Sequence, residues 1–376
     1  MFDTFLREAE ADGLLKEYSP EHFLIQAMNG QTPMFFEEHQ NIKSNSAVNR
    51  AKMDIASTFV ANFSCGLQRL ASHFCEKDIE KFIKGQLAAG KDNYSEDQFV
   101  QAFSEVMVLG FLTDFAGKKV VQATYEPKLQ GQSNPEARIE YNDGVVFDVE
   151  VKTPCFPKII TIPKDKRGIL KPNMVLTREQ FSLAKELCQN ANIEFMPPRV
   201  LKIKDFIKSA SNKFEKVDNI EHFNILFINW TLSDFYNVGV NEPIGLIGNP
   251  INGIIHCSEA ASQIGISDKD LENISAIVIY RDSFDSISQC DYRWHFAAPK
   301  RVELILNGSV QSEHVQNIAK KLNRDPMNTS FCEWAPFDWA FDKDEDEITI
   351  KTQADSLFRT MMKLSPQGAN TFNFSV

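Results

Sequence analysis

Residues 145–152 read Val-Val-Phe-Asp-Val-Glu-Val-Lys, and this stretch decides the expected fold. Apolar and charged residues alternate in it with a period of two, which predicts a β-strand. One face of the strand is apolar and faces a core, while Asp148, Glu150 and Lys152 share the other face. Two carboxylates and an amine in a row are costly to bury and are not needed for folding. Such a row is, however, what metal-assisted cleavage of a phosphodiester requires.

The residues just before this stretch predict a partner strand. Asn142-Asp143-Gly144 is typical of a tight hairpin turn, because these residue types tolerate positive φ. Residues 135–141 also alternate, with Glu136, Arg138 and Glu140 on one face. Pairing through the turn brings the two acidic faces side by side. Since like charges repel, a divalent cation between them is the simplest compensation.

At these residues the chain resembles the PD-(D/E)XK nuclease superfamily, which has the restriction-endonuclease-like fold. Pro135-Glu136 stands in the place of the family's Pro-Asp, and Glu150-Val151-Lys152 matches its Glu-x-Lys. The chain departs from the family at Glu136, where Asp is usual, so Glu140 and Asp148 remain alternatives for this ligand. The resemblance covers about residues 95–230 and identifies no subfamily.

The order of the expected elements is also similar to the common core of that superfamily. The residues from Ser95 to Gln98 are typical of a capping box that opens a helix over 97–112. After this helix, hydrophobic patterns predict three strands, at 119–125, 135–141 and 145–152. They then predict a helix at 203–216 and two further strands, at 223–230 and 274–280. The expected class is therefore α/β: a helix, three strands, a helix and a strand that form a mixed sheet flanked by helices, preceded by a helical segment.

Composition limits the organisation and the compartment. With 376 residues, the chain is long enough for more than one core. We expect an N-terminal helical segment at 1–92, a nuclease-like domain at 93–300, and a C-terminal extension at 301–376 with an aromatic cluster and a flexible tail. No apolar stretch approaches membrane-spanning length, and the start is not typical of a signal peptide. Seven scattered cysteines without a Cys-x-x-Cys pair indicate free thiols in a reducing cytoplasm.

The net charge of −11 argues against tight non-specific binding to DNA. The charge is uneven, because residues 152–217 contain 14 basic and 6 acidic residues, which leaves −19 for the remainder. Part of this basic stretch is a loop punctuated by proline that contains Lys158, Lys164, Lys166, Arg167 and Lys171. The loop could contact phosphates on either side of a scissile bond, or it could be a solvated surface without a partner.

The resemblance implies a metal site on the hairpin. Glu136 and Glu150, with the backbone carbonyl of Val151, would hold Mg²⁺, for which Mn²⁺ can substitute. The ion would polarise the phosphate and lower the pKa of a bound water. Lys152 would orient that water or offset charge at the phosphorus. The alternative for Lys152 is an ordinary salt bridge at a strand edge.

Glu105, on the first helix of the expected core, is a further candidate. The resemblance implies that it assists metal binding. The alternative is a polar helix face that Glu105 shares with Gln98 and Gln101. Lys213 could contact phosphate in the same cleft, or it could be an ordinary exposed helix lysine.

Two functions of different classes follow. The first is a Mg²⁺-dependent endonuclease acting on nucleic acid, with DNA the favoured substrate, in restriction, phage defence or repair. The second is a catalytically inactive module of the same fold that binds nucleic acid or protein partners, and a homo-oligomer is compatible with both. Glu150 and Lys152 favour the first function, while Glu136 and the negative charge favour the second. A third alternative is an unrelated α/β protein whose hairpin acids are only surface residues.

Other chemistries lack their motifs. His256-Cys257 and Trp294-His295 do not have the spacing of zinc ligands, and no Gly-x-Ser-x-Gly elbow is present. Residues 245–250 contain two glycines but match no phosphate-binding pattern, so a turn is expected there.

Overall fold

The computed structural model describes eleven stretches of the chain, at residues 5–31, 46–113, 119–128, 133–154, 162–217, 219–230, 240–249, 252–281, 302–306, 336–341 and 343–364. Contacts divide the chain into two units. The first comprises Met1–Cys155, Val217–Thr231 and Tyr280–Val302, and the second Phe156–Lys216, Leu232–Ile279 and Glu303–Val376. The three segments expected from sequence stay predictions, since each unit is assembled from several stretches. Lys158, Trp334 of the expected aromatic cluster and the C-terminal tail lie outside the described residues.

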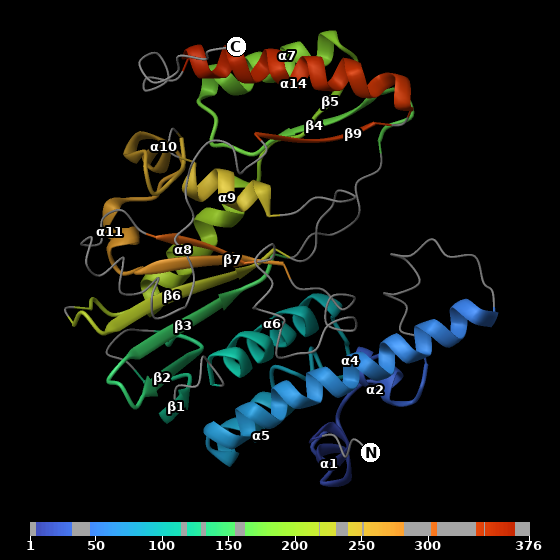
Figure 1. Cartoon of the computed structure of the whole chain (residues 1–376), viewed down its shortest axis with the longest axis vertical. Helices are drawn as coiled ribbons and strands as arrows, with labels where there is room; N and C mark the ends of the chain where they lie inside the picture. The colour runs from blue at the N-terminus through green and yellow to red at the C-terminus, as the bar shows by residue number, and fades with distance from the viewer. Residues whose placement is uncertain are drawn as a thin grey trace. The chain divides into compact units, whose positions relative to one another are not determined.

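The first unit begins with helices, as the sequence predicts for its N-terminal part (Figure 1): α1 (Phe5–Ala11), α2 (Phe23–Met28), α4 (Ser46–His73), α5 (Glu76–Lys84) and α6 (Glu96–Thr113). Buried phenylalanine rings join them. Phe59 of α4 stacks on Phe63 and Phe103, and Phe23 of α2 stacks on Phe99. Aromatic rings bury large apolar areas, so this cluster accounts for part of the high phenylalanine content.

The hairpin that the sequence predicts is present. Strand β2 (Ala137–Tyr141) pairs antiparallel with β3 (Val146–Lys152), and β1 (Val120–Tyr125) pairs antiparallel with β2. Gly144 has a φ of 83° in the connecting turn, where its amide donates to the carbonyl oxygen of Tyr141. This positive φ explains why glycine stands at that position.

Strand β6 (His222–Asn229) lies parallel to β3 on the side opposite β2, so these strands follow the order β1-β2-β3-β6. They belong to a six-stranded mixed sheet that also counts β7 (Ala276–Tyr280) and β8 (Val302–Leu306). Helix α6 contacts β2 and β3, and α4 contacts α6, so helices cover one face of this sheet. The expectation of an α/β protein with a mixed sheet flanked by helices is confirmed.

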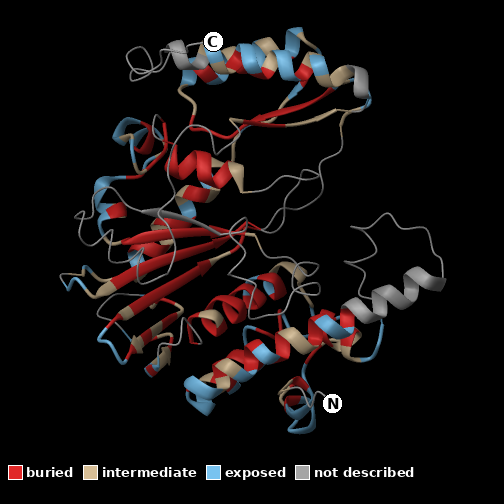
Figure 2. Ribbon diagram, viewed as in Figure 1, coloured by how far each residue is buried: buried red, intermediate tan, exposed pale blue. Residues whose placement is uncertain are grey.

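Strand β3 is more deeply buried than the alternating pattern predicts (Figure 2). Phe147 and Val149 are fully buried as expected, but Asp148 and Glu150 on the other face are also fully buried. The expectation that the charged face would be left out of the core is therefore wrong. Burial on both faces is typical of strands that have a parallel neighbour, as β3 has in β6.

The second unit contains a three-stranded sheet, in the order β5 (Glu194–Phe195), β4 (Gly168–Pro172) and β9 (Phe337–Phe341). Its helices are α7 (Arg178–Asn190), α8 (Val200–Lys213), α9 (Asn241–Gly248), α10 (Ser258–Gln263), α11 (Asp268–Glu272) and α14 (Asp344–Leu364). The turn expected at residues 245–250 is wrong, because residues 241–248 form α9. Every residue of α9 from Glu242 to Gly248 is buried, so burial of its apolar side chains outweighs the low helix propensity of its two glycines.

None of the described helices is both long and apolar enough to cross a membrane. The cysteines within the described residues, Cys65, Cys75, Cys188 and Cys257, are free thiols.

Candidate active site at the end of a buried strand

Glu150 and Lys152 lie at the carboxyl end of β3 and point to the same face, because they are two residues apart on a strand. The Nζ atom of Lys152 is 2.6 Å from Oε1 of Glu150. The Glu150 side chain is fully buried, whereas that of Lys152 keeps 21% of its surface exposed. A buried carboxylate is costly without compensating charge, and the lysine ammonium supplies that charge. The pair is therefore a buried acid whose cationic partner still reaches solvent.

Asp148 is bound by an arginine and a histidine of neighbouring strands. Arg138 lies opposite it on β2 and donates from Nε to Oδ1 and from Nη2 to Oδ2, both at 2.7 Å. His222 of β6 places Nε2 2.9 Å from Oδ2. Burial alone would raise the pKa of Asp148, but the hydrogen bonds and charges of Arg138 and His222 bring it below its usual value. Arg138 and His222 thus supply protein partners for this carboxylate, while the expected divalent cation stays a prediction.

Glu136 lies just before β2 and is half-buried. The last pair of the β2–β3 ladder joins Ala137 to Val149, so one further step in the same register places Glu136 opposite Glu150. Its carbonyl oxygen accepts a hydrogen bond of 2.9 Å from the amide of Glu126, which fixes the backbone at this point. Of the alternatives for this ligand, Asp148 is already bound by Arg138 and His222. Glu140 pairs with Val146 at the far end of β3, away from Glu150.

Glu105 is buried on α6, with only 9% of its surface exposed, so the alternative of a solvent-facing polar helix face is wrong. The hydroxyl of Tyr125, at the end of β1, donates to its Oε2 at 3.2 Å. Burial, followed by the negative charges of Glu105, Glu136 and Glu126, raises the pKa of Tyr125 above its ordinary value. The Tyr125 hydroxyl therefore lies within the electrostatic influence of both Glu105 and Glu136.

The two predicted acids of the hairpin, Glu136 and Glu150, thus come together, and Lys152 lies beside Glu150. Val151 lies beyond the last residue of β3 that pairs with β2, next to these acids. Glu105 lies on α6, which contacts β2 and β3, and it accepts a hydrogen bond from the hydroxyl of Tyr125. Tyr125 pairs with Ala137, so its side chain lies on the apolar face of the sheet, whereas Glu136 points to the other face. The structure therefore does not bring Glu105 together with Glu136 and Glu150. Across the part of the chain that the structure describes, no three His, Cys, Asp or Glu side chains gather closely enough to hold one metal ion.

Sequence reasoning missed three side chains of this region: Arg138, Tyr125 and His222. Counting residues outward from the turn would have placed Arg138 opposite Asp148, so the signal was present. No local signal identifies His222, because it comes beside Asp148 only through the parallel pairing of β3 with β6.

The second unit contains a separate ionic cluster, which we call the closed cluster: Lys171 of β4, Arg199 before α8, Glu242 of α9 and Asp338 of β9. Lys171 is fully buried, with Nζ 2.9 Å from Oε2 of Glu242 and 3.4 Å from Oδ2 of Asp338. Arg199 donates to Glu242 from its backbone amide at 2.9 Å and from Nε at 2.8 Å. The expectation that Lys171 belongs to a phosphate-contacting loop is wrong, because it is a buried strand residue. Lys164 and Arg167 of the same stretch are exposed.

Burial acts differently on the two carboxylates of the closed cluster. Burial tends to raise the pKa of Glu242, but the charges and hydrogen bonds of Lys171 and Arg199 lower it below its usual value. Burial raises the pKa of Asp338, and Lys171 only partly opposes that effect. The cluster therefore shifts the two carboxyl groups in opposite directions, with the pKa of Glu242 lowered and that of Asp338 raised.

Comparison of the chain with protein-family models, with curated proteins and with solved structures gave no match.

Proposed function

We propose that the chain is a Mg²⁺-dependent nuclease that hydrolyses phosphodiester bonds of nucleic acid, with DNA the favoured substrate. The observation that carries this proposal is the pair of Glu150 and Lys152 at the end of a buried strand, with Glu136 opposite. Helix α6, strands β1, β2 and β3, helix α8 and strand β6 occur along the chain in the order of the restriction-endonuclease-like core, with β4, α7 and β5 inserted between β3 and α8. The antiparallel and parallel pairings of a mixed sheet agree with that resemblance.

The donor set suits magnesium in its chemistry. Carboxylate oxygens of Glu136 and Glu150 and the carbonyl oxygen of Val151 are the hard oxygen ligands that Mg²⁺ prefers. This set has two carboxylates, in keeping with the lack of three clustered acids among the described residues. When bound, the ion would polarise a phosphate oxygen and lower the pKa of its water. Glu105 accepts a hydrogen bond from Tyr125 and is not part of this donor set.

Lys152 lies where its ammonium could stabilise negative charge on a bound phosphate. Its ammonium is held by Glu150 on one side and remains partly exposed, so it can approach a phosphate that enters at the end of β3. A fixed positive charge in a largely buried place stabilises the developing negative charge of a phosphoryl transition state more than it would in water. Glu150 keeps that ammonium in place before substrate arrives.

The test is cleavage of supercoiled plasmid and of single-stranded DNA by the purified full chain with Mg²⁺, with Mn²⁺ or with EDTA. We expect metal-dependent cleavage that falls about a hundredfold or more in Lys152→Ala and in Glu150→Gln, because each removes a charge at the reacting phosphate. Lys119→Ala, which removes an exposed lysine ahead of β1, is the matched control and should cleave as the wild type does. Cleavage that is unchanged in folded Lys152→Ala would overturn the assignment.

The second candidate is a non-hydrolytic module of the same fold that binds nucleic acid or protein partners. Two observations favour it. Glu105 and Glu150 already interact with side chains of the same chain, Tyr125 and Lys152, and the net charge of the chain is −11. No cleavage of any DNA or RNA with either metal, by a chain whose circular dichroism shows it folded, would select this candidate.

A further inference from the structure

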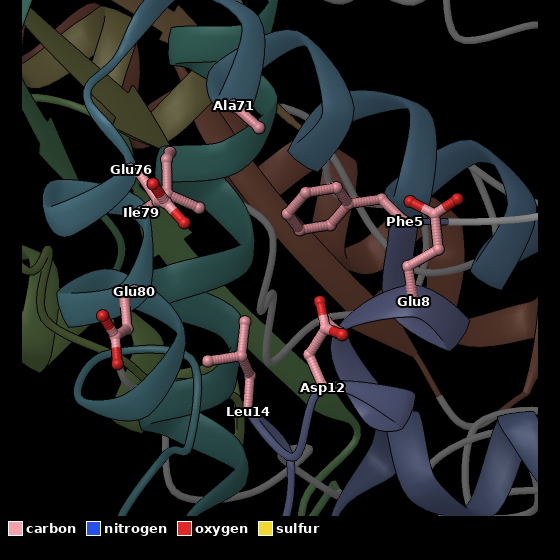
Figure 3. Close-up of a pocket in the computed structure, with 9 residues that line it drawn as sticks. Phe5, Glu8, Asp12, Leu14, Ala71, Glu76, Ile79 and Glu80 are labelled. Atoms are coloured by element: carbon pink, nitrogen blue, oxygen red, sulfur yellow. The ribbon is translucent and has the colours of Figure 1, made fainter.

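The described residues of the first unit contain a groove between α1 and α5, far along the sequence from the hairpin. Its volume is about 460 Å³, which lies in the range of natural binding pockets. Phe5 of α1, Leu14 and Ile79 of α5 supply apolar surface to it. Figure 3 shows the Phe5 ring and the Leu14 side chain turned into the space between the two helices. The floor of the groove is therefore apolar.

The rim of the groove is acidic. Glu8, Asp12, Glu76 and Glu80 line it, and all four are exposed. Lys84 forms an ion pair with Glu80 one helical turn away, whereas the described ion pairs include none made by Glu8, Asp12 or Glu76. No basic side chain is among the lining residues. The groove is thus an apolar surface surrounded by negative charge.

The spacing of these residues explains why acid and apolar groups share the same surface. Glu76, Ile79 and Glu80 stand three and four residues apart on α5, so they lie on one face of that helix. Phe5, Glu8 and Asp12 repeat the same spacing along α1 and just past its end. Ile79, Phe82 and Ile83 of α5 are buried in the unit, whereas Glu76 and Glu80 are exposed. Both walls of the groove consequently present the same combination of apolar and acidic groups.

We propose that this groove docks a basic amphipathic segment of a protein partner. Apolar side chains of the segment cover the partly exposed Phe5 and Leu14, while lysines or arginines on its flanks approach the four carboxylates. Charge complementarity sets the occupant, because an acidic segment would be repelled and a neutral apolar one would leave the carboxylates to be desolvated without compensation. Lysine and arginine also suit this geometry because their methylene stems cover apolar surface while the charged ends reach the rim. The proposal does not depend on nuclease activity.

The test uses a fluorescent helical peptide of leucine and lysine, about 14 residues long, whose leucines follow the spacing of one helix face. Its binding to the full chain is measured by fluorescence anisotropy. We expect the double variant Glu8→Gln with Glu76→Gln to bind about tenfold more weakly than the wild type. The matched control is Glu10→Gln with Asp78→Asn, which removes the same charge from the same two helices outside the groove. It should retain wild-type affinity.

The control separates docking from general attraction to an acidic protein. Equal affinity of the wild type and both double variants, or equal weakening of the two variants, would overturn the proposal. A peptide in which serine replaces every leucine should bind about tenfold more weakly, since it offers no apolar surface. If that peptide, or spermine, binds as tightly as the leucine–lysine peptide and with the same dependence on Glu8 and Glu76, the groove is a site for small cations and the proposal fails.

Discussion

Each unit of the chain buries carboxylates beside a lysine, but the two lysines differ in their access to solvent. In the first unit, Lys152 is about one-fifth exposed and holds Glu150 at the end of a strand. In the closed cluster, Lys171 is fully buried between Glu242 and Asp338. A reactive group must be reached by substrate, whereas a group that only joins elements is best shielded from water. The comparison therefore agrees with the proposed chemistry at the strand-end pair and indicates a structural role for the closed cluster.

The largest effect on stability should come from a substitution that breaks the closed cluster. Glu242→Gln leaves the buried ammonium of Lys171 without its nearest carboxylate and removes the ionised partner of Arg199. We expect the free energy of unfolding to fall by about 3–5 kcal/mol, the usual cost of leaving one charge of a buried pair behind. Urea denaturation followed by circular dichroism measures it. A loss below about 1 kcal/mol would show that water reaches the cluster.

In the first unit, the free energy of unfolding should depend on pH by a similar amount. His22, before α2, donates from Nε2 to the carbonyl oxygen of Leu87 at 2.8 Å, and its Nδ1 accepts from the amide of Leu24. Burial lowers its pKa to about 4, although the hydrogen bond to Leu87 acts in the opposite direction. Between pH 6.5 and 4, His22 is therefore protonated in the unfolded chain but neutral in the folded chain. Stability is complete above pH 6.5 and should decrease by about 3 kcal/mol as the pH falls to 4.

Denaturation at several pH values measures this decrease. His22→Gln should remove most of it, because glutamine does not titrate. His73→Gln, which changes an exposed histidine at the end of α4, is the control and should leave the decrease in place. The same decrease in both variants would contradict the assignment to His22.

Lys152→Ala should have a smaller effect on stability than Glu242→Gln. Because the ammonium of Lys152 is partly exposed, water can replace some of its interaction with Glu150. We expect a loss of about 1–2 kcal/mol, together with the much larger loss of cleavage described above. Urea denaturation and the plasmid assay on the same preparation separate the two effects. A stability loss equal to that of Glu242→Gln would remove the distinction between the clusters.

The smallest effect on stability should come from Asp338→Asn. Since burial raises the pKa of Asp338, its protonated form suits the fold and asparagine resembles that form. In the wild type, this group contributes stability that is complete below pH 3.8 and is lost as the pH rises through its folded pKa. The variant should change the free energy of unfolding at pH 7 by about 1 kcal/mol or less and should lose this part of the pH dependence. Denaturation across the pH range above 3.8 checks both statements.

Sequence patterns predicted the elements whose signal is local. Helix α6 and strands β1, β2, β3 and β6 lie within two residues of the predicted bounds, because periodicity and the turn at Gly144 are properties of adjacent residues. Residues 177–180 also follow the Thr-x-x-Gln pattern of a capping box, and the box is present at the start of α7, where the Gln180 side chain accepts from the Thr177 amide. In the predicted site, Glu150 and Lys152 share a face as strand geometry requires.

What the sequence could not provide depends on distant residues. Burial of both faces of β3 requires β6, and the hydrogen bond between Asp148 and His222 forms only because that strand pairs with β3. The sheet of the second unit pairs β4 with β9, whose residues come from the aromatic stretch near the C-terminus. The same pairing brings Asp338 to Lys171 and turns an expected surface lysine into a buried one.

The parallel pairing of β3 with β6 has a consequence for the speed of folding. Between these strands the chain passes through β4, α7, β5 and α8, so a long loop must close before the pair can form. The entropic cost of closing this loop must be met before the contacts between the strands can form. Contacts between residues far apart in sequence therefore slow folding. The β1-β2-β3 meander is local and should form early, whereas docking of β6 should limit the refolding rate. Until then the open edge of β3 is exposed to other chains, which makes a newly synthesised chain most prone to aggregation at this stage.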